Sequence, residues 1–67
     1  MTKDEFIKKN TIRKLGLVEY IKRLEKQGLS ERDVQAELIK RKVVKSPRML
    51  DLEWKFYQQY KNEISWI

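Results

Sequence analysis

Apolar positions along the chain recur at intervals of three and four residues, the spacing that places side chains on one face of an α-helix. The clearest run lies within residues 12–27 and consists of Leu17, Val18, Ile21 and Leu24. We therefore predict an amphipathic helix over residues 12–27. Gly28 is expected to end this helix at positive φ, because glycine has no Cβ to clash there.

A short helix is predicted before it, over residues 3–9. Thr2 and Glu5 form a capping-box pattern, in which hydroxyl and carboxylate each satisfy a backbone N–H at a helix start. Phe6 and Ile7 are the only apolar residues of this segment, so it has to dock on the rest of the chain or fray. Residues 10–11 are the expected break, with one continuous helix running on to residue 27 as the alternative.

Ser30 predicts the start of a further helix that runs to about residue 41 or 42. Its hydroxyl suits an N-cap, and Leu29 and Val34 flank it as a hydrophobic staple. The residues predicted to face inward are Val34, Leu38 and Ile39.

A turn is predicted next, in which Val43 and Val44 both tuck into the core. Ser46 is then an N-cap and Pro47 begins a last helix, where its missing N–H costs nothing. The apolar residues from here on spread over two stripes, wider than one face of a three-helix core requires: Met49, Leu50, Leu52, Trp54, Phe56, Tyr57, Tyr60 and Ile64.

These elements predict an all-α fold, with one small domain of three main helices and a short N-terminal helical extension at residues 1–10. The chain has no cysteine and no histidine, which excludes a disulfide framework and a Cys/His zinc site. No apolar run reaches the roughly 18 residues of a membrane span, and the N-terminus lacks a signal-peptide pattern. We expect a cytoplasmic protein with no membrane partner.

Catalytic motifs are missing from the sequence. The two glycines are isolated, no histidine is available as a base, and the serines have no triad partners. We therefore expect neither an enzyme nor a cofactor or small-molecule substrate.

Sixteen Lys and Arg residues against ten Asp and Glu give a net charge of +6, which attracts polyanions. Two groups of cations contain no acidic residue: Lys40, Arg41, Lys42, Lys45 and Arg48 form one, and Lys8, Lys9, Arg13 and Lys14 form the other. For each lysine taken singly, a solvated surface charge is the alternative interpretation.

Residues 29–50, LSERDVQAELIKRKVVKSPRML, resemble the helix-turn-helix found at the start of many transposases and in related recombinase and phage DNA-binding proteins. The matching positions are Leu29, Ser30, Arg32, Asp33, Val34, Leu38, Arg41, Val43, Ser46 and Leu50, within about a third of the chain. The chain departs from the pattern at Lys42, where a glycine often stands. It also carries Asp51 and Glu53, whose carboxylates repel phosphates unless they accept a hydrogen bond from cytosine.

The resemblance implies that the helix beginning at Pro47 enters the major groove of double-stranded DNA. Its base-contacting residues would be Arg48, Asp51 and Lys55, with Arg48 best suited because a guanidinium pairs bidentately with guanine. Phosphates would be held by Lys40, Arg41, Lys42 and Lys45, and by Lys8, Lys9, Arg13 and Lys14 if the N-terminal arm lies along the DNA. The expected function is a small DNA-binding regulator or recombination accessory factor of phage or mobile-element type, acting by site occupancy.

The excess of aromatic and apolar residues towards the C-terminus favours a different function. A protein-binding inhibitor or adaptor would dock this surface on a larger partner enzyme, or on a second copy as a homodimer. The candidate interface residues are Trp54, Tyr57, Tyr60, Trp66 and Ile67. Core packing is the main alternative role for aromatics at helical spacing, and stacking on single-stranded bases is another.

Overall fold

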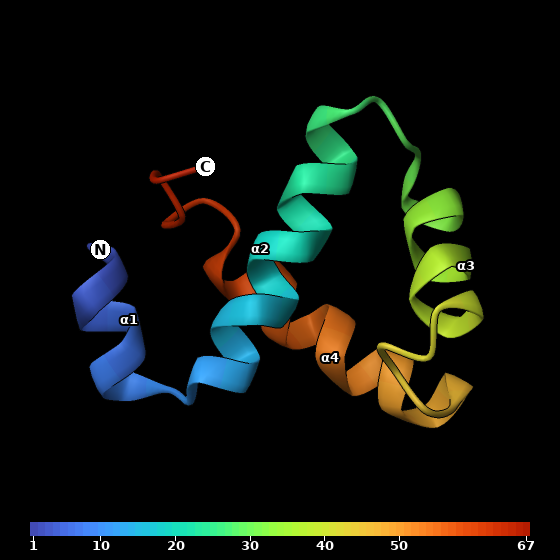
Figure 1. Cartoon of the computed structure of the whole chain (residues 1–67), viewed down its shortest axis with the longest axis horizontal. Helices are drawn as coiled ribbons and strands as arrows, with labels where there is room; N and C mark the ends of the chain where they lie inside the picture. Colours follow the sequence, from blue (N-terminus) through green and yellow to red (C-terminus); the bar gives the residue numbers. More distant parts are fainter.

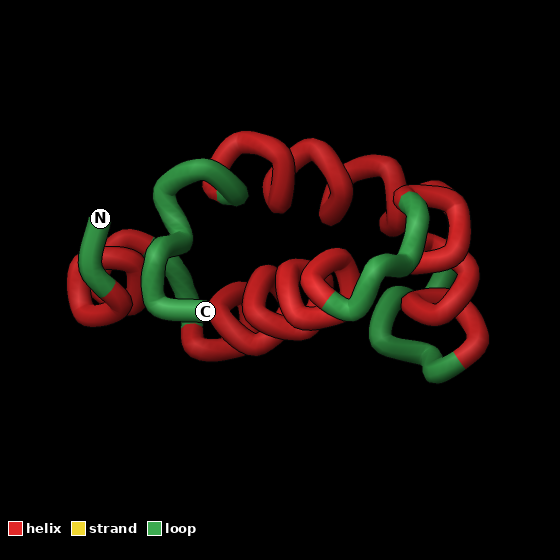
Figure 2. The backbone as a smooth tube through the Cα atoms, turned by 90° about the horizontal axis from the view of Figure 1, so that it is seen from above, coloured by secondary structure: helices red, strands yellow, loops and turns green.

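The computed structural model of the chain describes residues 1–67 and contains four α-helices and no strand (Figure 1). The helices are α1 (Lys3–Lys9), α2 (Ile12–Lys26), α3 (Glu31–Lys40) and α4 (Pro47–Tyr60). The predicted all-α class is confirmed. Helix α4 crosses behind α2, while α1 and α3 lie towards opposite ends of the molecule's longest dimension, an arrangement that Figure 2 shows from above.

Every helix begins at a threonine or serine hydroxyl. Thr2, Thr11, Ser30 and Ser46 each accept a hydrogen bond from the backbone N–H three residues later, at 3.2–3.3 Å. The Thr11 cap follows extended backbone at Asn10, so α1 and α2 are separate and the alternative of one continuous helix is wrong. The predicted capping box at Thr2 is only partly formed, since its own hydroxyl donates to the Glu5 carboxylate at 3.3 Å.

Helices α2 and α3 end in the same backbone geometry. The residue after each C-cap is left-handed, with φ +94° at Gly28 and +58° at Lys42. In α3, the Lys42 N–H bonds the Ile39 carbonyl and the Val43 N–H bonds the Leu38 carbonyl, the pair of bonds that defines a Schellman motif. This turn ends α3 at Lys40, slightly before the predicted boundary at residue 41 or 42.

Lys42→Gly is expected to stabilise the fold by up to about 1 kcal/mol. A left-handed backbone costs residues with a Cβ roughly 1–3 kcal/mol, and glycine relieves this strain. Part of the gain is offset because glycine has more conformational freedom in the unfolded chain. Lys42→Ala removes the same charge but keeps the Cβ, so it should bring no gain. Urea unfolding followed by circular dichroism measures both variants, and equal midpoints would contradict the prediction.

The core draws residues from every helix and from the C-terminal segment. Its buried members are Phe6, Leu15, Leu17, Val18, Ile21, Val34, Leu38, Val44, Trp54, Tyr57 and Ile64. Phe6 is fully buried, and its ring meets Tyr60 and Trp66 edge-on, with centroids 5.1 and 6.0 Å away. The seven-residue α1 is therefore held by its contacts with the rest of the chain, chiefly those of Phe6, rather than by its own helical stability.

Two inward-facing predictions need correction. Val43 is 43% exposed, because the left-handed turn at Lys42 directs only Val44 into the core. Ile39 is exposed as well, since Val34 and Leu38 already define the buried stripe of α3 and the next residue is rotated away from it.

The C-terminal segment folds back on the first two helices. Ile64 is buried, the Trp66 indole N–H donates to the Glu19 carboxylate at 3.0 Å, and the Lys26 ammonium donates to the Ile67 carbonyl. The apolar C-terminal end therefore packs on its own chain.

Tyr57 connects α4 to α2 through the core. Its ring is almost completely buried, and its hydroxyl donates to the Glu25 carboxylate. Burial, followed by this hydrogen bond, raises the pKa of the Tyr57 hydroxyl well above its usual value of 10.0.

Because the folded-state pKa of Tyr57 lies above the unfolded value, its contribution to stability is complete below about pH 10 and declines above it. Above that pH, the free energy of unfolding falls by up to about 1.4 kcal/mol per pH unit for one such group. Tyr57→Phe should remove this part of the alkaline decline. Urea unfolding of both proteins from about pH 8 to about pH 11 tests this, and parallel curves would refute the assignment to Tyr57.

Candidate nucleic-acid interface

Helix α4 presents one polar face to solvent and its aromatic face to the core. Arg48, Asp51 and Lys55 are all exposed and are spaced by three and four residues, so the three predicted base-contacting residues lie on the same face. Gln58 and Gln59 continue this face and are also exposed. Sequence reasoning missed these two glutamines, although they stand three and four residues after Lys55.

The side chains on this face suit recognition of base edges. A guanidinium pairs bidentately with guanine, a carboxamide with adenine, and a carboxylate accepts from the cytosine amino group. Arg48, Asp51 and Gln58 supply one of each type. Leu52, which is 65% exposed, is the main apolar side chain among them.

The connection between α3 and α4 spans residues 41–46 and carries most of the first cationic group. Lys40, Lys42 and Lys45 are exposed and form no ion pair. Arg41 is exposed too, but its Nε donates to the Glu37 carboxylate at 2.9 Å, and this hydrogen bond raises the pKa of Arg41. The start of α4 is thus bordered by unpaired positive charge.

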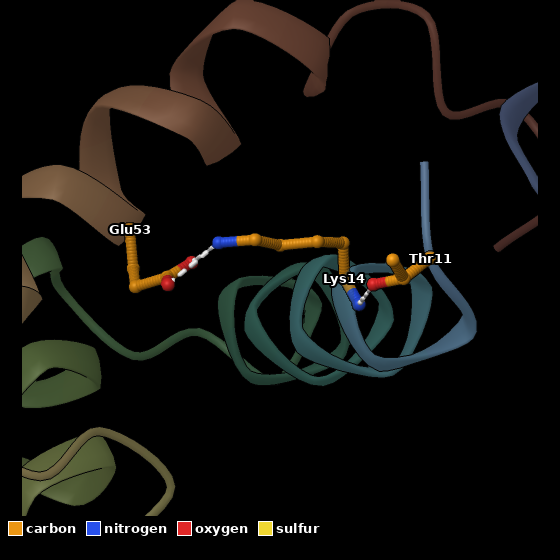
Figure 3. Close-up of polar contacts among 3 residues, drawn as sticks. All are labelled: Thr11, Lys14 and Glu53. Carbon is orange, nitrogen blue, oxygen red and sulfur yellow. Dashed lines mark hydrogen bonds and ion pairs between the residues drawn. The ribbon is translucent and has the colours of Figure 1, made fainter. Parts of the chain in front are cut away.

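Lys14, predicted as a phosphate contact, has an internal partner. Its ammonium reaches from α2 to both Glu53 oxygens on α4 at 2.6 Å, as Figure 3 shows, and lies 5.0 Å from the centroid of the Phe56 ring. Thr11 caps the same turn of α2 through the Lys14 backbone N–H. Glu53 is therefore neutralised on the inner side of α4, and Asp51 is the acid left on its outer face.

The Lys14–Glu53 pair joins two helices and is less exposed than the Arg41–Glu37 pair at the end of α3. Glu53→Gln is therefore expected to cost about 1–2 kcal/mol of unfolding free energy, whereas Glu37→Gln should cost under about 0.5 kcal/mol. Urea unfolding at neutral pH compares the two. Equal losses would show that the interhelical pair is no stronger than an ordinary surface pair.

The second cationic group is divided by the fold. Lys8 and Lys9 are exposed at the end of α1, which lies at the far end of the molecule from the α3–α4 corner in both views (Figures 1 and 2). Arg13 instead borders a surface groove that Lys45 also lines. The two predicted groups therefore do not form one continuous surface, although Arg13 and Lys45 line the same groove.

The predicted partner-contacting aromatics are largely internal. Trp54 and Tyr57 are 8% and 2% exposed, and both belong to the core. Tyr60, Trp66 and Ile67 are half-buried and pack against it. The placement of these residues shows core packing, which was the alternative role considered for them. Trp54 and Tyr57 in particular offer almost no surface to a partner.

No three carboxylates lie close enough together to hold a metal ion. None of the four helices combines the length and the apolar character that crossing a membrane requires. Comparison with protein-family models, with curated proteins and with solved structures found no match for this chain. The features of this chain that bear on function are therefore the surface of α4 and its connection to α3.

Proposed function

We propose that this protein binds double-stranded DNA, with the exposed face of α4 in the major groove. The observation that carries the proposal is the single solvent-facing stripe of Arg48, Asp51 and Lys55, bordered at the start of α4 by cations without carboxylate partners. A helix fits the major groove, and its N-terminal residues reach the base edges.

In this proposal α3 and α4 act as the helix-turn-helix, α2 supports them, and α1 is the N-terminal extension of a three-helix domain. The left-handed backbone of Lys42 supports the resemblance, because it supplies at this position the conformation for which the family often uses glycine. The connection at residues 41–46 is longer than the usual turn of three or four residues.

The two sets of residues would contribute differently to binding. Lys40, Lys42 and Lys45 would neutralise phosphates and give affinity that depends on salt and not on sequence. Arg48 would supply sequence preference through guanine, and Asp51 would accept from cytosine. Such a protein acts by occupying a site and so blocking or redirecting another protein, as expected of a phage or mobile-element regulator or recombination accessory factor.

The first test is a mobility shift of a random duplex pool at low salt, followed by selection of the retained sequences. Arg48→Ala is then expected to weaken binding to the selected site by about 1–3 kcal/mol and to relax the preference at one position. Circular dichroism checks that the variant keeps its helices. Failure of the wild-type protein to retard any duplex at low salt would refute the proposal.

The salt dependence of the same shift separates the two cationic groups. Lys45→Gln should reduce the slope of log affinity against log salt concentration by about 0.9, the value for one lost phosphate contact. Lys9→Gln makes the same change of charge at the far end of the molecule and should leave the slope unaltered. If the two variants change the slope equally, binding involves the N-terminal arm or is not localised at the α3–α4 corner.

The alternative function is an inhibitor or adaptor that docks the aromatic residues of the last helix on a larger enzyme. Trp54 and Tyr57 would be its main anchor residues, but both are buried in the core. A surface suited to a protein partner lies elsewhere, between α2 and the α3–α4 connection.

A further inference from the structure

The first turns of α2, the α3–α4 connection and the start of α4 enclose an open groove of about 750 Å³. Its apolar lining consists of Leu17, Tyr20, Val43, Val44 and Met49. Val43 and Met49 are both 43% exposed, so a substantial part of this lining faces water in the isolated chain. Grooves of this size with apolar walls are typical binding sites.

Gly16 forms part of the wall that α2 contributes. A Cβ at this position would meet no atom within 4 Å, and its φ is not positive, so neither packing nor backbone conformation requires glycine here. Glycine is among the poorest residues for a helix interior. What it provides at this position is a bare stretch of helix backbone that another backbone can approach closely.

The charged side chains that line the groove are predominantly positive. Arg13 and Lys45 line it from α2 and from the connection, and neither has a carboxylate partner. The one acid in the lining, Glu53, is held by Lys14. An occupant that brings carboxylates would therefore find two free cations beside the apolar floor.

We propose that this groove binds an acidic amphipathic helix of a partner protein. The apolar side chains of that helix rest on Tyr20, Val43 and Met49, its carboxylates meet Arg13 and Lys45, and its backbone passes over Gly16. This is the helix-in-groove mode of recognition. Nucleic acid fits less well because it would leave the apolar floor uncovered, and a second copy of this chain fits less well because each copy carries a net charge of +6.

The test is a display selection with random peptides of about 16 residues, long enough for four helical turns. The full-length wild-type chain is the target, and Gly16→Leu serves for counter-selection, because leucine favours the helix and fills the groove. The enriched peptides are expected to carry apolar residues at i, i+3 or i+4, and i+7, with an excess of Asp and Glu. Absence of enrichment, or enrichment of neutral or basic peptides, would overturn the proposal.

Fluorescence anisotropy with the best selected peptide then localises the site. Gly16→Leu should weaken binding by about tenfold or more and Gly16→Ala by roughly threefold, each loss corresponding to a few removed contacts. Arg13→Gln and Lys45→Gln should each weaken it several-fold, while the matched charge change Lys9→Gln leaves it unaltered. Both Gly16 variants should melt no lower than wild type; equal affinity of wild type and the Gly16 variants would overturn the proposal.

The mobility shift with duplex DNA distinguishes this site from the DNA-binding face. Gly16→Leu should leave DNA binding intact, since Gly16 lies off the exposed stripe of α4. If Gly16→Leu abolishes DNA binding and duplex DNA displaces the peptide, the groove belongs to the DNA interface and the peptide proposal is overturned. Loss of DNA binding by Arg48→Ala with the peptide affinity unchanged supports two separate sites.

Discussion

The four helices are held together first of all by the aromatic face of α4, which packs against α2 and α1. The chain has no disulfide or Cys/His metal site to hold it together, so its stability has to come from burying apolar side chains. Trp54 and Tyr57 supply the largest buried surfaces of α4, and Phe6 brings the short α1 into the same core. A fully buried apolar side chain such as Phe6 contributes roughly 1.5–3 kcal/mol.

This packing also decides which side chains remain for function. With Trp54 and Tyr57 buried in the core, Arg48, Asp51 and Lys55 are left exposed on the same helix. The Lys14–Glu53 pair removes one cation and one anion from the surface together. The outer face of α4 is therefore more positive at its beginning than the sequence of the helix suggests.

The two proposed surfaces share the α3–α4 connection. Lys45 belongs both to the cations beside α4 and to the lining of the groove, while Val43 and Met49 belong to the groove. The left-handed turn at Lys42 creates this arrangement by turning Val43 outward and Val44 inward. One local backbone feature thus shapes both surfaces. Arg48 belongs only to the proposed DNA-binding face and Gly16 only to the groove, so substitutions at these two residues distinguish the two surfaces.

Helix boundaries are predictable from the sequence to within a few residues, because caps and helical spacing act over no more than four positions. Ser30, Gly28 and Ser46-Pro47 are signals of this kind, and the stripe of Arg48, Asp51 and Lys55 follows directly from them. The Lys14–Glu53 pair and the groove that Gly16 lines together with Val43 became visible only in the folded chain. Those relations join residues far apart in the chain, and they depend on how the helices pack rather than on any local pattern.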